Sequence, residues 1–445
     1  MDVTQLYHQK LCTAQEAVRL VKDGDWVDYS QSAAFPEALD SALAQRRGEL
    51  ADVKVRGGIA LKPVQVVEQD PEQQSFTYHV WHCSAIDRGY IDRGLAFFQP
   101  MLFRDCGSYY ARGFAKVDVA MLSVAPMDKD GNFSFSIMNG VTREIVDSAR
   151  TVILEVCPGL PVVYGRSGDH IHITEADAVV EGGKPAGTAP SPQPTPIDRQ
   201  IAGHILPHLR DGITLQLGIG GMPNALGALI AQSDLKDIGI HTEMMGDGYL
   251  ALYRAGKVTN RKKEIDRGKG VFSVGAGSQE LYQLLDRHMG FLSAPMGYVN
   301  DPMTIRQFSN FVSINGCISM DLYGQVCSES TGIRQISGTG GQLDFVTGAY
   351  MSEHGKAFLS MSSVFTDRQG YRHSRILPRF TQGDIVTTPR AQAPCIVTEY
   401  GVACLSGLAT WQRSEAIIAI AHPDFREDLI QAAQEQGIWR RSQRR

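Results

Sequence analysis

Short apolar runs alternate with stretches of helical periodicity along the whole chain. In the first half, the predicted elements are strands at WVDYS, 53–59, 117–124 and 151–156 and helices at 13–21 and 36–45. The run 151–156 is apolar at successive positions, which is typical of a strand buried on both faces of a parallel sheet. The first helix begins with a capping box, because Glu16 stands three residues after Thr13.

The second half repeats the same alternation. Its predicted elements are helices at 201–209 and 223–232 and strands at 213–217 and 238–244. Strands and helices in strict turn indicate a parallel sheet that is covered by helices on both faces. We therefore predict an α/β fold for both halves.

A break in composition separates the two halves. Residues 181–198, EGGKPAGTAPSPQPTPID, hold five prolines and three glycines, which cannot sustain a helix or a sheet ladder. The chain of 445 residues is also longer than a single core usually becomes. We predict an N-terminal domain at 1–185, a linker at 186–198 and a C-terminal domain at 199–445. A long loop within one domain stays open as the alternative.

Charge and composition exclude several kinds of partner. The formal net charge of -5 argues against a nucleic-acid surface. No run of about 18 apolar residues is present, so no membrane-spanning helix is expected. The polar start MDVTQLYHQKL carries no signal-peptide core, and we expect a cytoplasmic protein.

Metal binding is not expected either. The eight cysteines include no CxxC pair, and their spacing suits neither a disulfide framework nor a zinc site. His79, His82 and Cys83 cluster in YHVWHC, but no second ligand pair follows at a suitable spacing. Lining of a pocket or ordinary packing are the other interpretations of this cluster.

A glycine-rich turn in the second half is a candidate binding element. An apolar strand runs into Gly218, Ile219, Gly220 and Gly221, and Pro223 then opens a helix. Such a turn directs backbone N–H groups toward a negative charge. A dinucleotide fingerprint would need a third glycine, and a P-loop would need Gly-Lys-Ser/Thr. Nucleotide binding, a simple tight turn and an oxyanion site all remain possible from the glycines alone.

Glu243 strengthens the oxyanion interpretation. It lies at the end of the next predicted strand, one crossover after the glycine turn. The carboxyl ends of neighbouring parallel strands open at one edge of a sheet, where ligands bind. We therefore expect the amides of Gly220 and Gly221 and the carboxylate of Glu243 to face one crevice. A carboxylate beside such donors suits nucleophilic attack on an activated carbonyl, with an acyl anhydride as the first product.

Several stretches resemble the family I CoA-transferases. They are GIGGMPNA, HTEMMGDG, ISGTGGQLDFVTGAYMSEHGK, VTEYGVACLSGL and TWQRSEAIIAIAHPDFR. The likeness covers nearly the whole chain and is strongest to the branch with butyryl-CoA:acetate and 4-hydroxybutyrate CoA-transferases, of the acetyl-CoA hydrolase/transferase family. The resemblance implies two similar open-sheet α/β domains in tandem, with the active site in the interdomain cleft.

The resemblance also implies roles for individual residues. Glu243 would form a glutamyl-CoA thioester. The oxyanion hole and the CoA thioester would be lined by Gly218, Ile219, Gly220, Gly221 and Met222. Gly341 and Lys356 would contact CoA, and Asn300 would lie near the pantetheine.

The resulting hypothesis is a CoA-transferase with ping-pong chemistry. It would move CoA from a short-chain acyl-CoA such as butyryl-CoA to a carboxylate such as acetate, or act as a 4-hydroxybutyrate or propionate type. Coenzyme A is then substrate and covalent intermediate, and no bound cofactor or metal is expected. We expect a homo-oligomer, a dimer or higher. An acyl-CoA hydrolase, an inactive acyl-CoA-binding protein and a nucleotide-dependent enzyme are the alternatives.

Overall fold

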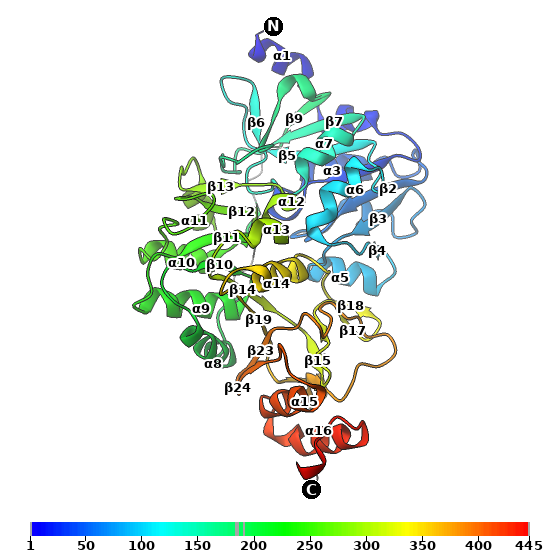
Figure 1. Ribbon diagram of the computed structural model, residues 1–445. Helices are drawn as coiled ribbons and strands as arrows, with labels where there is room; N and C mark the ends of the chain where they lie inside the picture. Colours follow the sequence, from blue (N-terminus) through cyan, green and yellow to red (C-terminus); the bar gives the residue numbers. More distant parts are fainter. Residues whose placement is uncertain (1, 183–186, 190–191, 444–445) are drawn as a thin grey trace. The chain divides into compact units, whose positions relative to one another are not determined.

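The structure is a computed structural model that describes residues 2–182, 187–189 and 192–443. These residues form two compact units (Figure 1). Unit 1 combines residues up to 189 with 242–246 and 269–300, and unit 2 combines 192–241, 247–268 and 301–443. Both units contain parallel sheets with helices, so the predicted α/β class is confirmed. The predicted domain boundaries at 185 and 199 stay a prediction. The placement of the active site in an interdomain cleft also stays a prediction.

Unit 1 is built on a seven-stranded sheet of parallel neighbours in the order β4-β3-β2-β1-β5-β7-β9. Its strands are β1 (Trp26–Tyr29), β2 (Val53–Gly57), β3 (Phe76–Val80), β4 (Ala96–Phe98), β5 (Val119–Val124), β7 (Thr151–Val156) and β9 (Ala178–Glu181). The first strand, β1, has β2 on one side and β5 on the other. The order therefore reverses beside β1, and ligands of open α/β sheets bind at such a switch point.

Helices and short strands complete unit 1. The helices are α1 (Val3–Lys10), α2 (Ala14–Ala17), α3 (Glu37–Ala44), α4 (Gln65–Glu68), α5 (Ala85–Asp92), α6 (Cys106–Ala111), α7 (Thr142–Ser148), α11 (Gln279–Leu285) and α12 (Met296–Val299). The short strands are β6 (Asn132–Ser134), β8 (His170–His172), β12 (Gly270–Gly275) and β13 (Phe291–Ser293). The capping box that Thr13 and Glu16 predict is present at the start of α2.

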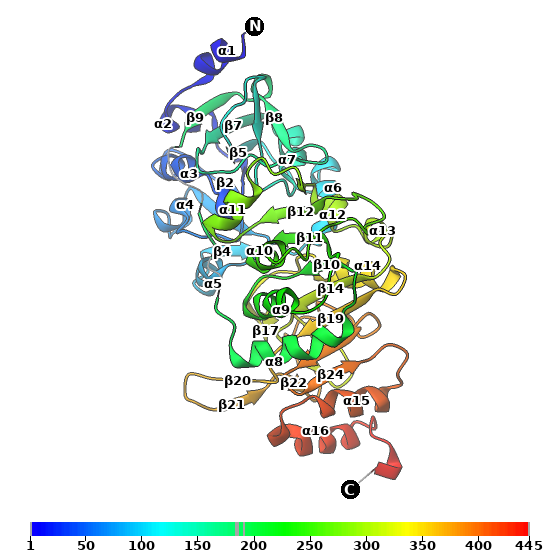
Figure 2. The same cartoon turned by 90° about the vertical axis from the view of Figure 1, so that its left-hand side faces the viewer.

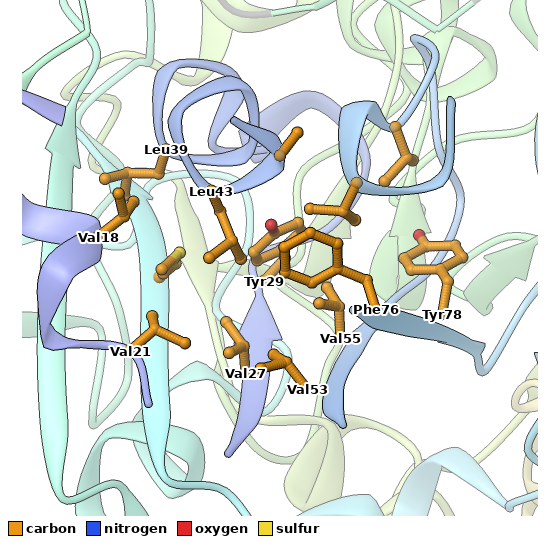
Figure 3. Close-up of a cluster of buried hydrophobic side chains, with 14 of the residues drawn as sticks. Val18, Val21, Val27, Tyr29, Leu39, Leu43, Val53, Val55, Phe76 and Tyr78 are labelled. Carbon is orange, nitrogen blue, oxygen red and sulfur yellow. The ribbon is translucent and has the colours of Figure 1, made fainter. Parts of the chain in front are cut away.

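The core of unit 1 lies between the sheet and helices from its first 70 residues. Figure 3 shows aliphatic side chains of strands and helices meeting around the rings of Tyr29 and Phe76. The members labelled there are Val18, Val21, Val27, Tyr29, Leu39, Leu43, Val53, Val55, Phe76 and Tyr78. All of them are 5% exposed or less, and burial of this kind stabilises the unit by about 25 cal/mol per Å² of apolar surface.

In unit 2, the strands β11, β10, β14, β19, β23 and β24 follow one another in an eight-stranded sheet that also includes β12 and β13. These strands are β10 (Thr214–Leu217), β11 (Gly239–Met245), β14 (Phe311–Gly316), β19 (Lys356–Ser360), β23 (Cys395–Thr398) and β24 (Gly401–Cys404). All neighbours among them are parallel except β23 and β24. The order reverses beside β10, which places a second switch point between β10 and β14. The last residues of β11, 242–245, belong to unit 1.

The helices of unit 2 include two that pack side by side, α8 and α9 (Figure 2). They are α8 (Pro196–Ile205), α9 (Gly221–Gln232), α10 (Asp247–Arg254), α13 (Pro302–Ile305), α14 (Gln342–Met351), α15 (Thr410–Ala419) and α16 (Pro423–Glu435). Short strands are β15 (Ser319–Asp321), β16 (Val326–Cys327), β17 (Ser330–Thr331), β18 (Arg334–Gln335), β20 (Val364–Thr366), β21 (Arg372–Ser374) and β22 (Ile376–Leu377). No helix within the described ranges is long and apolar enough to cross a membrane.

Two expectations about local structure need correction. The helix predicted from 201 begins at Pro196, because Thr195 and Asp198 form a capping box and Pro196 occupies the first helical turn. The end of the predicted linker is therefore helical, while its residues 186, 190 and 191 lie outside the described residues. The cysteine spacing does not suit a disulfide framework, yet Cys395 and Cys404 face each other on β23 and β24 and form one disulfide.

Lys263 is a buried cation in unit 2. Its Nζ donates a hydrogen bond of 2.9 Å to the carbonyl of Ile240, and it lies 5.5 Å from the ring centre of Phe308. Burial lowers the pKa of this lysine to about 7, and the charge of Asp266 raises it only in part. Folding therefore favours the neutral amine between about pH 7 and the ordinary lysine range.

This burial predicts a pH-dependent stability. Between about pH 7 and 10 the unfolded chain holds one more proton at Lys263 than the folded chain, so the free energy of unfolding rises with pH by up to about 1.4 kcal/mol per unit. Lys263→Met removes this contribution. Urea unfolding at pH 7.5 and 9.5 measures the free energy of unfolding of both proteins. The variant should be more stable than the wild type, and this difference should be smaller at pH 9.5 than at pH 7.5. An advantage independent of pH would contradict this account.

Candidate active site

The glycine turn lies at the carboxyl end of β10, at the switch point of unit 2. Gly218 donates its N–H to the carbonyl of Ile314 on β14, at 2.9 Å. Gly220 has φ 128°, a conformation that L side chains rarely adopt, and precedes α9. Because Gly220 serves as the N-cap, α9 begins at Gly221 rather than at the predicted Pro223.

The start of α9 is suited to a negative charge. No side chain caps the helix, so its first N–H groups depend on backbone, water or a ligand for partners. Ile219 is 55% exposed, whereas Met222 is buried and anchors the first turn. The turn thus leaves backbone N–H donors that can bind an anion.

Buried amides fix the strands on both sides of the switch point. Ser313 donates to Oε1 of Gln216 at 2.7 Å, and Gln216 donates to Oδ1 of Asn315 at 2.9 Å. The Asn315 amide returns hydrogen bonds to Gln216 and Ser313. A buried network with its members satisfied in this way rigidifies its surroundings. It holds the last residues of β10 and β14 in register immediately before the glycine turn.

Tyr249 connects α10 to the end of β10. Its hydroxyl accepts a hydrogen bond of 2.6 Å from the N–H of Leu217, the last residue of β10. The ring is 2% exposed. The sequence did not lead us to predict a role for Tyr249. Its position six residues after Glu243, in GDGY, could have indicated that it lies near the site.

Two glycines allow α9 and α10 to approach at backbone distance. A Cβ placed on Gly227 of α9 would lie 2.7 Å from the carbonyl oxygen of Gly248 on α10. A Cβ on Gly248 would lie 3.3 Å from the carbonyl of Pro223. Because backbone atoms cannot move aside as a flexible side chain can, neither position has room for alanine.

Glu243 lies in the part of β11 that belongs to unit 1, and it is half-buried. Nδ2 of Asn300 donates a hydrogen bond of 2.6 Å to its Oε2. A donor at this distance from a carboxylate makes a charge-assisted hydrogen bond, which is stronger than a neutral one. The amide therefore fixes the direction of the carboxylate.

Asn300 is itself well supported. It is fully buried at the end of α12, and its N–H donates to the carbonyl of Met296 at 2.9 Å. Its Oδ1 has no hydrogen-bond partner within the described part of the chain, so this buried oxygen is available to a ligand. The resemblance implied a place near the pantetheine, and the structure adds a direct contact with the Glu243 side chain.

Unit 1 also contains a small cavity that Met296 of α12 helps to line. Its volume is about 20 Å³, and Met296 of α12 and Trp81 contribute to its wall. Met296 and Asn300 are four residues apart, so their side chains are neighbours about 5–6 Å apart on one helical face. The cavity also touches Tyr29, the last residue of β1, and Gln31, which follows β1 at the switch point of unit 1.

The YHVWHC cluster contributes to this region without forming a metal site. Trp81 lines the cavity, and burial lowers the pKa of His82, whose ring lies 5.7 Å from that of Phe103, to about 4. Burial likewise lowers the pKa of His79 to about 4, and its ring lies 4.9 Å from that of Trp26. Both histidines are thus neutral packing groups near pH 7.

Gly341 precedes α14 in unit 2, at the same sheet edge as the glycine turn. The last turn of α14 is fixed beside the first residue of β14, because Ser352 accepts the N–H of Phe311 and donates to Phe308. Since α14 runs back along the sheet, its first residue, next to Gly341, lies toward the carboxyl ends of the strands. Glu329 holds the preceding loop by accepting a hydrogen bond from Thr339 at 3.0 Å.

Lys356 lies elsewhere in unit 2. It is exposed and is the first residue of β19, and its Nζ donates to the carbonyl of His208 at 2.9 Å. Because β10, β14 and β19 are parallel, this is the edge opposite to the glycine turn. The structure therefore brings Gly341 to the edge of the glycine turn but does not bring Lys356 there.

Models of known families match both ends of the chain. Residues 1–187 match the acetyl-CoA hydrolase/transferase N-terminal domain, and residues 277–433 match the C-terminal domain of the same family. A protein of Anaerostipes caccae named butyryl-CoA:acetate CoA-transferase is 45% identical over 99% of this chain and 100% of its own length. The chain belongs to the acetyl-CoA hydrolase/transferase family. The resemblance inferred from the sequence is therefore confirmed.

Two further similar proteins support this family assignment. A probable butyrate:acetyl-CoA coenzyme A-transferase of Syntrophomonas wolfei is 44% identical over 98% of this chain and 97% of its own length. The crystal structure of RipA from Yersinia pestis is 37% identical and superposes with a TM-score of 0.91, over 98% of this chain and 100% of that one. The prediction of a CoA-transferase enzyme is confirmed at the level of the family.

The contact of α9 with α10 gives a test of how the glycine turn is positioned. Gly227→Ala should destabilise the protein by about 1–3 kcal/mol and lower kcat, because α9 must move away from α10 and take the turn with it. Gly203→Ala on α8 is the control, since a Cβ there meets nothing within 4 Å. It should be neutral or stabilising by about 0.4–1 kcal/mol. Equal melting temperatures for the two variants would contradict the close-approach argument.

Proposed function

We propose that this enzyme transfers coenzyme A from a short-chain acyl-CoA to a free carboxylate, with butyryl-CoA as donor and acetate as acceptor. The contact that supports this proposal most directly is the hydrogen bond from Asn300 to Glu243, which fixes a half-buried carboxylate at the end of a strand. The names of the two relatives at 44–45% identity support the choice of butyryl-CoA and acetate.

The proposed chemistry begins with attack on the thioester. An oxygen of Glu243 attacks the acyl carbonyl, and the CoA thiolate leaves, which gives an acyl-glutamyl anhydride. The thiolate then attacks the glutamyl carbonyl, releases the acyl group as a free carboxylate and leaves a glutamyl-CoA thioester. Acetate displaces the thiolate to form a second anhydride, and the thiolate attacks its acetyl carbonyl. Acetyl-CoA leaves and the Glu243 carboxylate is restored, so no ATP is consumed.

Backbone donors would stabilise the charge that develops in these steps. We assign this role to the turn that comprises Gly218, Ile219, Gly220, Gly221 and Met222, because it follows β10 directly and α9 has no side-chain cap. One such donor is typically worth ~10²–10³ in rate. Gly341 is assigned to CoA contact because it lies at the same sheet edge. Lys356 would contribute only by long-range attraction.

The size of the cavity lined by Met296 supports a short acyl group. A volume of about 20 Å³ holds little more than one water molecule, so this cavity leaves no space for a long acyl chain. Its wall is largely apolar and includes Trp81, Met296 and Met138. We further propose that the enzyme acts as a cytoplasmic homo-oligomer, as the sequence predicts.

The mechanism is tested by trapping the intermediate. Incubation with butyryl-CoA alone should raise the protein mass by one CoA less water, on the peptide that contains Glu243. Glu243→Ala should abolish the adduct and the transfer, and Glu243→Asp should lower kcat by ~10²-fold, since the attacking oxygen moves by about 1 Å. Glu72→Ala, an exposed carboxylate of unit 1, is the control and should keep full activity. Full activity in Glu243→Ala would overturn the mechanism.

Product analysis separates transfer from hydrolysis. With butyryl-CoA and acetate, a transferase makes acetyl-CoA and butyrate in equal amounts, and little CoA is released when acetate is omitted. A hydrolase releases free CoA at a rate that does not depend on acetate. The second result would replace the proposed transfer by hydrolysis through the same glutamyl thioester.

The role of Asn300 predicts an effect on kcat and on pH dependence. Asn300→Ala should lower kcat by roughly 10–100-fold, the usual worth of a hydrogen bond to a charged group. Asn300→Asp places a second carboxylate beside Glu243, so the pKa of the pair rises and the acidic limb of the pH–rate profile moves to higher pH. Asn132→Ala on β6 serves as the control. An unmoved profile in Asn300→Asp would contradict the contact as a determinant of catalysis.

A further inference from the structure

Unit 2 contains a cavity that the proposed reaction does not use. It has a volume of about 980 Å³ and lies past the carboxyl ends of β14 and β19, where Cys317 and Met361 form part of its wall. Phe425 and Leu429 of α16 close another side. This volume is at the upper end of the range for small-molecule sites. None of the residues assigned to catalysis above lines it.

Arg375 brings an uncompensated positive charge to this cavity. Its Nη1 donates to the carbonyl of Ile318 at 3.0 Å, and its guanidinium lies 5.2 Å from the ring centre of Phe365. Its Nε is buried and has no hydrogen-bond partner among the described residues. Burial lowers the pKa of Arg375, and the charge interaction with Cys317 offsets this only in part.

Two basic side chains near Arg375 have a carboxylate partner, whereas Arg375 has none among the described residues. Arg372 pairs with Asp424 at 2.5 Å, and His373 pairs with Asp367 at 2.7 Å. No carboxylate within the described ranges forms an ion pair with Arg375. A partly buried charge without a counter-ion is costly, and a bound anion would offset that cost. The arrangement is therefore that of an anion site.

The rest of the wall limits the kind of anion. It is formed largely by apolar side chains, among them Ile318, Met361, Phe365, Ile376, Phe425 and Leu429. Arg334, Asp384 and Asp428 also line the cavity, so together with Arg375 the charged groups of the wall balance and offer no surplus of positive charge to a ligand with several negative charges. One carboxylate on a long apolar body fits this wall.

We propose that unit 2 binds a medium-chain fatty acid in this cavity, with its carboxylate on Arg375 and its chain along Met361 and Phe425. All the residues that line this cavity belong to unit 2, whereas Glu243 belongs to unit 1. A fatty acid of this length exceeds the small cavity lined by Met296, so the ligand acts here as an effector rather than as the transferred acyl group. This inference does not depend on the proposed transfer reaction.

Isothermal titration of the full chain with decanoate, kept below its aggregation concentration, tests the site. The wild type should bind decanoate, and 1-decanol, which lacks the charge, should bind at least tenfold more weakly. Arg375→Met should weaken decanoate binding by roughly tenfold or more, as expected for a lost charge-assisted hydrogen bond. Arg375→Lys should retain part of the affinity. Arg379→Met, an exposed arginine outside the cavity, should bind as the wild type does.

Two further variants keep the test decisive. Leu429→Trp narrows the cavity without changing its charged groups and should weaken decanoate binding while circular dichroism stays native. Glu243→Ala should bind decanoate normally, which separates the cavity from the reaction site. Loss of binding in Glu243→Ala, or unchanged binding in Arg375→Met, would overturn the proposal. Absence of any binding by the wild type, as when a second copy of the chain covers the cavity, would overturn it as well.

Discussion

Parallel pairing of strands is the constraint on which the candidate site depends. In unit 2, β10 pairs in parallel with β11 on one side and with β14 on the other, so the chain leaves all three strands at one edge. The glycine turn follows β10, and α14 begins near the same edge after Gly341. Side chains could change at many positions without disturbing this arrangement, but a shift of register would move every group at once.

Amide groups, rather than charges, hold the reactive parts in place. The Gln216, Ser313 and Asn315 network joins β10 to β14, and the Asn300 amide holds Glu243. An amide can orient a carboxylate without neutralising it, whereas an arginine at the same distance would stabilise the anion and weaken it as a nucleophile. An amide donor therefore suits a carboxylate that must attack the substrate and then be regenerated in each catalytic cycle.

The sequence predicts the elements with strong local signals. The strand at 151–156 and the capping box of Thr13 and Glu16 are where the pattern places them. The start of α8 was missed because prolines dominate its surroundings, although proline is favoured in a first helical turn. The start of α9 was misplaced because the conformation of Gly220 cannot be read from residue types.

Contacts between distant segments are harder to predict. The hydrogen bond between Asn300 and Glu243 joins residues 57 positions apart, and no periodicity in the sequence predicts it. The resemblance named both residues but not their contact. The Cys395–Cys404 disulfide was missed for a related reason: it depends on the antiparallel pairing of β23 with β24, in a half of the chain where the pattern indicates parallel strands. The cavity around Arg375 is built from at least five separate segments and has no linear signature.

The composition of unit 1 has a consequence for how the chain matures. Its seven-stranded sheet is complete by Glu181, yet residues 242–246 and 269–300 belong to the same compact unit. On the ribosome, unit 1 therefore stays incomplete until residue 300 has been made. A nascent chain paused before β12 has been made lacks the backbone hydrogen bonds that this strand forms with Ile137 and Gly140.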